Sequence, residues 1–384
     1  MRQLVLLYWG CVFLMYLSQT YYPVETQLDG RQTGKRHFML RRADVFMIAT
    51  ILWLASFSFL RTSYNDTVNY ITFFREVEPL TELIRTEDFF SFGNNPFHEM
   101  YKAYIHELTE NYHIYFLFPA LLSNYAIIKL YKRYSNSLSF SMTVFLGLGT
   151  YIMYMAALKQ SLAIFFLVLS IPYAIDKKYF RFYLLVFIAT MFHTHAFMFA
   201  FLPFLFRIPW GKITWLLVVA VVLIMATYNT TMEAVMNFAL SIGVNVADFE
   251  LFDGHSINII RILVYSIPAA MALVFRNRLF SNSTRAENLF ANMSIVSVLI
   301  LSIGLIQGAN LFARMAAYFE FAIAISLPWM IEKLFTKGSA RFVKMFGTVL
   351  FFGYFYYEFA ISKSFDSGYR AITLWQFIVS LFGG

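Results

Sequence analysis

The chain has 384 residues, of which 59% are apolar, 20% aromatic and only 14% charged, whereas a soluble domain has about 45–50% apolar and about 25% charged residues. This composition argues against a soluble globule, a disordered chain and a nucleic-acid-binding protein. The single cysteine, Cys11, excludes a disulfide framework and a cysteine-based zinc site. We therefore predict an all-α polytopic membrane protein, whose net charge of +8 reflects basic cytoplasmic loops beside an anionic leaflet.

Membrane-spanning segments are predicted along the whole chain, because a helix needs roughly 20 mostly apolar residues to cross the hydrocarbon layer. The qualifying windows are Leu4–Ser18, Ala43–Leu60, His113–Leu130, Leu138–Ala157, Leu162–Ile175, Ile213–Tyr228, Ile257–Phe275, Leu289–Ile306, Leu311–Ile331 and Phe342–Ile361. With the ambiguous stretch Phe180–Phe206, we expect about 10–12 segments in one integral membrane domain, residues 1–384. The first segment has no small-residue cleavage site, so no removable signal peptide is expected.

The orientation is predicted from the basic residues, which accumulate on the cytoplasmic side. The loop Tyr21–Arg42 has five basic and two acidic residues, so we place it inside. The stretch Thr62–Tyr112 has nine acidic and three basic residues, so we place it outside. On this basis residues 62–112 and 229–256 are the long extracytoplasmic segments.

Whether the stretch Phe180–Phe206 crosses the membrane once or turns back is then decided by the side on which the later basic loops must lie. If it crossed the membrane once, every later basic loop would lie outside. If the chain turns back near His193-Thr194-His195, those loops return to the cytoplasmic side. We therefore expect Tyr179–Phe192 and Ala196–Phe206 to form a broken, re-entrant helix pair, which is tolerated only where the break is buried in protein or lines a wet cavity.

Four cations at the outer ends of predicted spans run against this charge bias, and such placement is expensive. They are Arg61, Lys159, Arg261 and Arg314. A phosphate or pyrophosphate on the outer side would explain them together, because guanidinium groups bind phosphate oxygens bidentately and lysine acts as a point charge. The alternative is that each cation snorkels to lipid phosphates or pairs with one acid.

Three further ionisable residues allow more than one interpretation. His193 and His195, at the predicted break, could supply a general base, stabilise the break by hydrogen bonding, or bind a metal. The sequence has no DxD or HExxH motif to supply further ligands, so no metal is expected. Asp66 could orient a cation, accept a hydroxyl proton, or cap the helix expected to begin near Thr67.

Four segments resemble, in order and spacing, the EpsG-type exopolysaccharide polymerases of the Wzy-like group, over roughly residues 45–330. LRTSYNDTVNYITFF is similar to an Arg-(x)4-Asp-(x)3-Tyr element, and LKQSLAIFF to an (Arg/Lys)-Gln-x-x-Ala element. FHTHAF is similar to Phe-His-x-Ser-Ala, and ARMAAYFEF to Arg-x-x-x-Tyr-Phe. The chain departs from these patterns at Lys159, where arginine is commoner, and at His195, which replaces a serine.

The resemblance implies a GT-C-like membrane glycosyltransferase in the bacterial cytoplasmic (inner) membrane, with its active site facing outside. Such enzymes transfer a growing glycan from one polyprenyl pyrophosphate to the non-reducing end of a repeat unit on another, making exopolysaccharide, capsule or O-antigen without a cofactor. Expected partners are the lipid-linked donor and acceptor and membrane lipids; a chain-length regulator could join them. Together with the placement of the four cations, the resemblance leads us to predict His193, His195 and Asp66 as catalytic residues. The predicted substrate-binding residues are Arg61, Tyr70, Lys159, Gln160, Arg314 and Tyr318, with Arg261 added from its position at the outer end of a span.

On this interpretation the cations and a histidine share one outward cavity, where the cations stabilise the departing pyrophosphate and a histidine removes the acceptor's proton. Two other classes remain as alternatives. A lipid-linked oligosaccharide flippase would need cations spread along a path across the bilayer. A membrane O-acyltransferase would need a cationic acyl-CoA site toward the cytoplasm, opposite to the expected side of Arg61 and Arg314.

Overall fold

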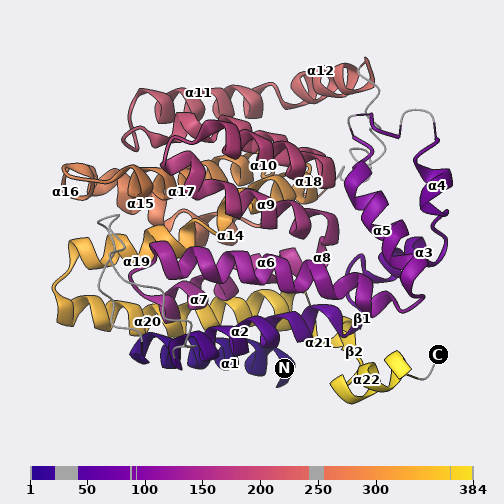
Figure 1. The fold of residues 1–384 in the computed structure, drawn as a ribbon. Coiled ribbons are helices and arrows are strands. Elements are labelled where there is room, and N and C mark those ends of the chain that lie inside the picture. The colour runs from indigo at the N-terminus through magenta and orange to yellow at the C-terminus, as the bar shows by residue number, and fades with distance from the viewer. Residues whose placement is uncertain are drawn as a thin grey trace. The chain divides into compact units, whose positions relative to one another are not determined.

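The computed structural model describes residues 2–21, 42–86, 89–91, 93–241, 255–363 and 365–382, and Figure 1 shows their path. These residues are almost entirely helical, with one antiparallel pair of short strands, β1 (Arg61–Ser63) and β2 (Arg370–Ala371). The predicted all-α class is therefore confirmed. The basic loop at 22–41 and the outer segment at 242–254, on which part of the orientation depends, lie outside the described residues.

Several helices are long and apolar enough to cross a membrane. In the described part of the chain these are α1 (Arg2–Tyr21), α6 (Tyr112–Tyr134), α9 (Leu158–Ile175) and α17 (Arg285–Ile303). Three bent pairs raise the number from 4 to as many as 7: α7 (Leu138–Gly147) with α8 (Thr150–Ala156), α11 (Lys212–Ala226) with α12 (Tyr228–Ser241), and α18 (Ala309–Glu320) with α19 (Ile323–Leu334). The chain is a multi-pass membrane protein. The expected number of about 10–12 segments also counts shorter apolar helices as separate segments, and it stays a prediction.

The chain divides into two compact units, and the predicted single functional domain stays a prediction. The first unit comprises Met1–Glu78, Lys102–Ser161 and Ile331–Gly384. It contains α1, α6, α7, α8 and both strands. It also contains α2 (Arg42–Phe59), α3 (Thr67–Arg75), most of α5 (Pro96–Leu108), α20 (Lys337–Tyr356), the π-helical turn η2 (Tyr357–Ser362), α21 (Phe365–Gly368) and α22 (Leu374–Phe382). Here α1 packs against α2 and α7, α2 against α6, and α20 against α7 (Figure 1).

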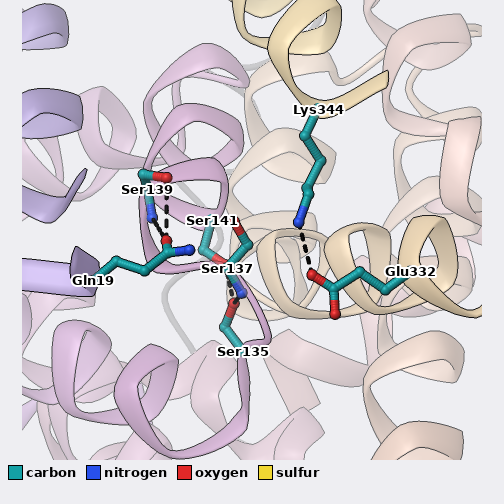
Figure 2. Close-up of polar contacts among 7 residues, drawn as sticks. All are labelled: Gln19, Ser135, Ser137, Ser139, Ser141, Glu332 and Lys344. Atoms are coloured by element: carbon teal, nitrogen blue, oxygen red, sulfur yellow. Dashed lines mark hydrogen bonds and ion pairs between the residues drawn. The ribbon is translucent and has the colours of Figure 1, made fainter. Parts of the chain in front are cut away.

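Side-chain polar contacts join α1 to α7 and α20 to the end of α19 (Figure 2). The Gln19 Oε1 atom, on α1, accepts hydrogen bonds from the backbone N–H and the hydroxyl of Ser139, each at 3.2 Å. Lys344 on α20 donates to Glu332 on α19 at 2.7 Å. Gly149, with φ +76°, sits at the bend between α7 and α8, where a Cβ atom would collide with the Phe359 ring. The bend therefore requires glycine at this position.

The second unit comprises Pro79–Tyr101 and Leu162–Met330. It contains α4 (Leu80–Leu83), most of α9, α10 (Tyr179–Phe192), the 3₁₀ helix η1 (Thr194–Phe206), α11, α12, α14 (Ile259–Tyr265), α15 (Ile267–Val274), α16 (Arg276–Phe280), α17, α18 and most of α19. The central helix α17 packs against α18, α11, α15 and η1. Its N-terminus has a capping box formed by Thr284 and Glu287.

The predicted helix break is present. Helix α10 ends at Phe192, His193 is extended (φ −156°, ψ 116°), and η1 begins at Thr194, two residues earlier than expected. The second half is 3₁₀ rather than α-helical, and it packs against α10. Long 3₁₀ runs are uncommon and often mark functional or strained positions, so this segment is a candidate functional element together with the break. Its re-entry into the membrane stays a prediction.

Candidate active site

Arg61 occupies a fully enclosed position in the first unit. It follows α2 as the first residue of β1, where it pairs with Ala371 of β2, while the Ile372 N–H donates to the Leu60 carbonyl at 3.0 Å. Its Nε donates to Thr67 Oγ1 at 2.9 Å, and its Nη1 donates to the carbonyl and hydroxyl oxygens of Ser58 at 2.5 and 3.0 Å. The guanidinium also lies 4.4 Å from the centre of the Phe116 ring.

The charge of Arg61 is not neutralised by any carboxylate among the described residues. Its Nη2 atom is buried and has no hydrogen-bond partner in that part of the chain. Burial lowers the pKa of Arg61 to about 10, so the side chain stays protonated at neutral pH. Because a buried charge is costly unless it is paired, the unpartnered Nη2 atom makes Arg61 a candidate contact for an anion.

Two other predicted residues belong to the same unit and lie just after Arg61 in the chain. Tyr70, on α3, is close enough for its charge to affect the pKa of Arg61. Asp66 occupies the N-cap position of α3, but its side chain makes no capping hydrogen bond. Asp66 thus has the expected position at the start of the helix. Its side chain does not cap the helix in this structure.

Lys159 and Gln160 lie in the first turn of α9. The Gln160 side chain is fully buried, and Lys159 is half-buried. The peptide dipoles of a helix create a positive potential at its N-terminus, which adds to the charge of Lys159. This turn is thus electrostatically suited to an anion, and the substrate-binding role of Lys159 and Gln160 stays a prediction.

The histidines of the second unit lie at the break between α10 and η1, and both are half-buried. The centres of the His193 and His195 rings are 5.1 Å apart. His193 Nδ1 lies 2.8 Å from the hydroxyl of Tyr318, on α18. Tyr318 is fully buried and follows Arg314 by four residues, so the two lie on one face of α18. The structure therefore brings together His193, His195 and Tyr318, which come from separate motifs in the sequence.

Asn95 anchors this break and is not among the predicted site residues. Its Oδ1 atom accepts hydrogen bonds from the Thr194 N–H at 2.9 Å and from the Thr194 hydroxyl at 3.2 Å. Beside it, the ring of Phe97 contacts that of Phe192 at 5.8 Å between centres. The Asn95-Pro96 pair does signal the start of a helix, α5. No local pattern signals the contact with Thr194, 99 residues away.

Arg261, predicted to bind substrate, forms an ion pair in this unit. Its Nη2 atom lies 3.4 Å from Oε1 of Glu320, whose side chain is fully buried. The Arg261 guanidinium also lies 5.2 Å from the Tyr265 ring centre. Arg261 thus pairs with an acid, which is the alternative considered from the sequence. Arg61, in contrast, has no carboxylate partner among the described residues. The sequence does not point to Glu320, because a lone acid in an apolar helix carries no motif.

The described residues contain no group of three or more His, Cys, Asp or Glu side chains arranged to hold a metal ion. The predicted site residues fall into two sets. Arg61, Asp66, Tyr70, Lys159 and Gln160 belong to the first unit, and His193, His195, Arg261, Arg314 and Tyr318 to the second. The expectation that both sets share one cavity stays a prediction.

Comparison with known proteins agrees with the resemblance seen in the motifs. A sequence model of the EpsG family matches residues 44–374, a range that contains both sets of residues. The chain belongs to the EpsG family. Membership indicates a membrane polysaccharide polymerase of glycosyltransferase type. Searches of curated proteins and of solved structures found no match.

Proposed function

We propose that this EpsG-family protein polymerises a polysaccharide at the outer face of the bacterial cytoplasmic membrane. It transfers a growing glycan from polyprenyl pyrophosphate to the non-reducing end of a lipid-linked repeat unit. The observation that carries the proposal is Arg61, a fully buried cation without a carboxylate partner in the described chain and with one nitrogen still lacking a hydrogen-bond acceptor. A diphosphate oxygen is the ligand that this nitrogen suits best.

The proposed reaction is a single displacement. A hydroxyl oxygen of the acceptor sugar forms a bond to the anomeric carbon of the donor, and the bond from that carbon to the pyrophosphate oxygen breaks. The electron pair leaves with the diphosphate, so the configuration at the anomeric carbon inverts. A histidine of the α10–η1 break accepts the proton of the attacking hydroxyl.

The cations act on the charge that develops as the diphosphate leaves. Arg61 is held by Ser58 and Thr67, so its guanidinium is already oriented before the substrate arrives. Fixed donors aimed at a developing charge lower the barrier by several kcal/mol, because they need not reorganise during the reaction. Lys159 and Arg314 contribute further positive charge, while Arg261 acts chiefly through its ion pair with Glu320.

The test uses the purified protein in lipid vesicles with polyprenyl-pyrophosphate-linked repeat units isolated from producing cells. The proposal predicts a ladder of longer glycans with the wild-type protein. Arg61→Lys keeps the positive charge but removes the planar guanidinium that can bind two phosphate oxygens at once. We therefore expect the polymerisation rate to fall at least about tenfold. Arg341→Lys, at an exposed position on α20, is the matched control and should retain the wild-type rate.

The same assay separates the alternatives. Translocation of the repeat units without elongation would indicate a flippase, and acyl transfer to the glycan would indicate an O-acyltransferase. Either result without a ladder would overturn the proposal. A wild-type rate in the Arg61→Lys protein would overturn the role given to Arg61.

A further inference from the structure

Both the backbone of His193 and one nitrogen of its ring are held by hydrogen bonds. Its backbone N–H donates to the Ala189 carbonyl at 3.0 Å, and its own carbonyl accepts from the Ala196 N–H at 2.9 Å. Its Nδ1 atom then meets the Tyr318 hydroxyl at 2.8 Å. Because the backbone and the Nδ1 side of the ring are both held, the orientation of the Nε2 side is fixed as well.

A neutral histidine carries its proton on one ring nitrogen, and the partner of the other nitrogen decides which. If Nδ1 holds the proton and donates to the Tyr318 oxygen, Nε2 presents a lone pair that can accept a proton. If Tyr318 donates to Nδ1 instead, Nε2 carries a proton and cannot act as a base. The hydrogen bond to Tyr318 therefore controls whether His193 can take part in proton transfer.

We infer that Tyr318 is a positioning residue for His193, whose hydroxyl oxygen accepts the Nδ1–H bond and so makes Nε2 the nitrogen that receives the acceptor's proton. The inference rests on the proposed function, and it replaces the substrate-binding role expected for Tyr318. A base oriented by a second side chain is a recurring arrangement in nucleophilic catalysis. It also assigns the base to His193 rather than His195.

The position of Tyr318 supports this role. The side chain is fully buried, so its hydroxyl has a fixed place. It lies one turn from Arg314 on α18, so one helix carries both the partner of the imidazole and the cation. In the reaction, the proton leaves the acceptor hydroxyl for Nε2 as the new bond to the anomeric carbon forms. The resulting imidazolium still donates through Nδ1 to Tyr318, which removes no proton itself.

A double-mutant cycle tests the inference. Initial polymerisation rates at saturating substrate are measured for the wild type, Tyr318→Phe, His193→Gln and the double variant, with lipid-linked repeat units in vesicles. Tyr318→Phe should lower kcat about tenfold and change KM less than twofold. In the His193→Gln background the same substitution should have no further effect, because it acts only through the imidazole. Tyr131→Phe, which removes another fully buried hydroxyl, is the control and should match the wild type.

Additive effects of the two substitutions, or a change confined to KM, would overturn the positioning role. The second measurement does not depend on turnover or on a folded Tyr318 variant. ¹⁵N spectra of histidine-labelled wild-type and His193→Gln proteins identify the His193 signals by difference. Signals of the Nδ1–H tautomer support the inference, and signals of the Nε2–H tautomer overturn it, whether or not the wild-type protein makes polymer.

Discussion

The side-chain oxygen of Asn95 accepts the first backbone N–H of η1, that of Thr194, at 2.9 Å, and so caps this helix from a distant part of the chain. The hydroxyl of the same threonine donates to the same oxygen at 3.2 Å. A helix N-terminus that starts inside apolar sequence must find acceptors for its leading N–H groups, and an asparagine side chain supplies one. The residue before Thr194 is His193, so this cap also fixes the candidate base.

Removing the Asn95 carboxamide should therefore lower the polymerisation rate without abolishing the fold. Each lost hydrogen bond costs about 1 kcal/mol, which corresponds to roughly a fivefold effect if it appears in the rate. Because Asn95 has φ +51°, Asn95→Gly removes the amide without adding backbone strain and is preferred to Asn95→Ala. Asn94→Gly, at the exposed neighbouring position, is the control. Equal rates for the Asn95→Gly and Asn94→Gly proteins would contradict the capping role.

Thr67 should matter for the binding of pyrophosphate because it orients Arg61. Thr67→Val keeps the side-chain shape and removes the oxygen that accepts the Arg61 Nε–H bond. We expect the dissociation constant of farnesyl pyrophosphate, measured by calorimetry in detergent, to rise about three- to tenfold. Thr72→Val, at an exposed position of the same helix, serves for comparison and should bind as the wild type does. Unchanged affinity in the Thr67→Val protein would mean that Arg61 does not bind the diphosphate in the orientation seen here.

The ion pair between Arg261 and Glu320 should contribute to stability more than the pairs near the surface. Glu320→Gln removes the partner of a largely buried guanidinium, for which the cost is up to about 3–5 kcal/mol. Glu332→Gln breaks the more exposed pair with Lys344, for which about 0–1 kcal/mol is expected. Thermal unfolding in detergent should show a clearly larger fall in midpoint for Glu320→Gln. Adding Arg261→Met to that variant should restore part of the loss, and a further fall would contradict the pairing.

Gly149 should not tolerate a side chain. Its φ of +76° is unfavourable for other residues, and a Cβ atom would collide with the Phe359 ring. Gly149→Ala should therefore lower the thermal midpoint, since the left-handed conformation alone costs about 1–2 kcal/mol. Gly353→Ala, in the interior of α20 with open space around it, should be neutral or stabilising. A midpoint for Gly149→Ala equal to that of Gly353→Ala would show that the bend does not depend on glycine.

Some of this arrangement can be predicted from the sequence because it follows from local composition. The parity of the basic loops predicts the break at His193, since each loop has a preferred side of the membrane. Arg61 and Arg314 are conspicuous because a cation is expensive at such positions. Arg314 and Tyr318 are grouped by the sequence itself, because both belong to the ARMAAYFEF segment that resembles a family element.

The rest depends on contacts between residues distant in the chain, which no local pattern encodes. The strand that pairs with β1 is formed by Arg370 and Ala371, and such a short segment has no recognisable strand periodicity. The pairing of Arg261 with Glu320 spans 59 residues, and no local pattern predicts it. The second half of the broken pair is 3₁₀ rather than α-helical, although its apolar sequence is equally compatible with both.

The central claim, that chain growth is driven by departure of a polyprenyl diphosphate, is tested most directly by stoichiometry. Purified protein in vesicles is given lipid-linked repeat units with labelled lipid and labelled sugar, and both products are counted in the same samples. The account predicts one polyprenyl pyrophosphate released for each linkage formed, with both falling together in the His193→Gln protein. Release of the lipid diphosphate without chain growth, or growth without its release, would contradict the account.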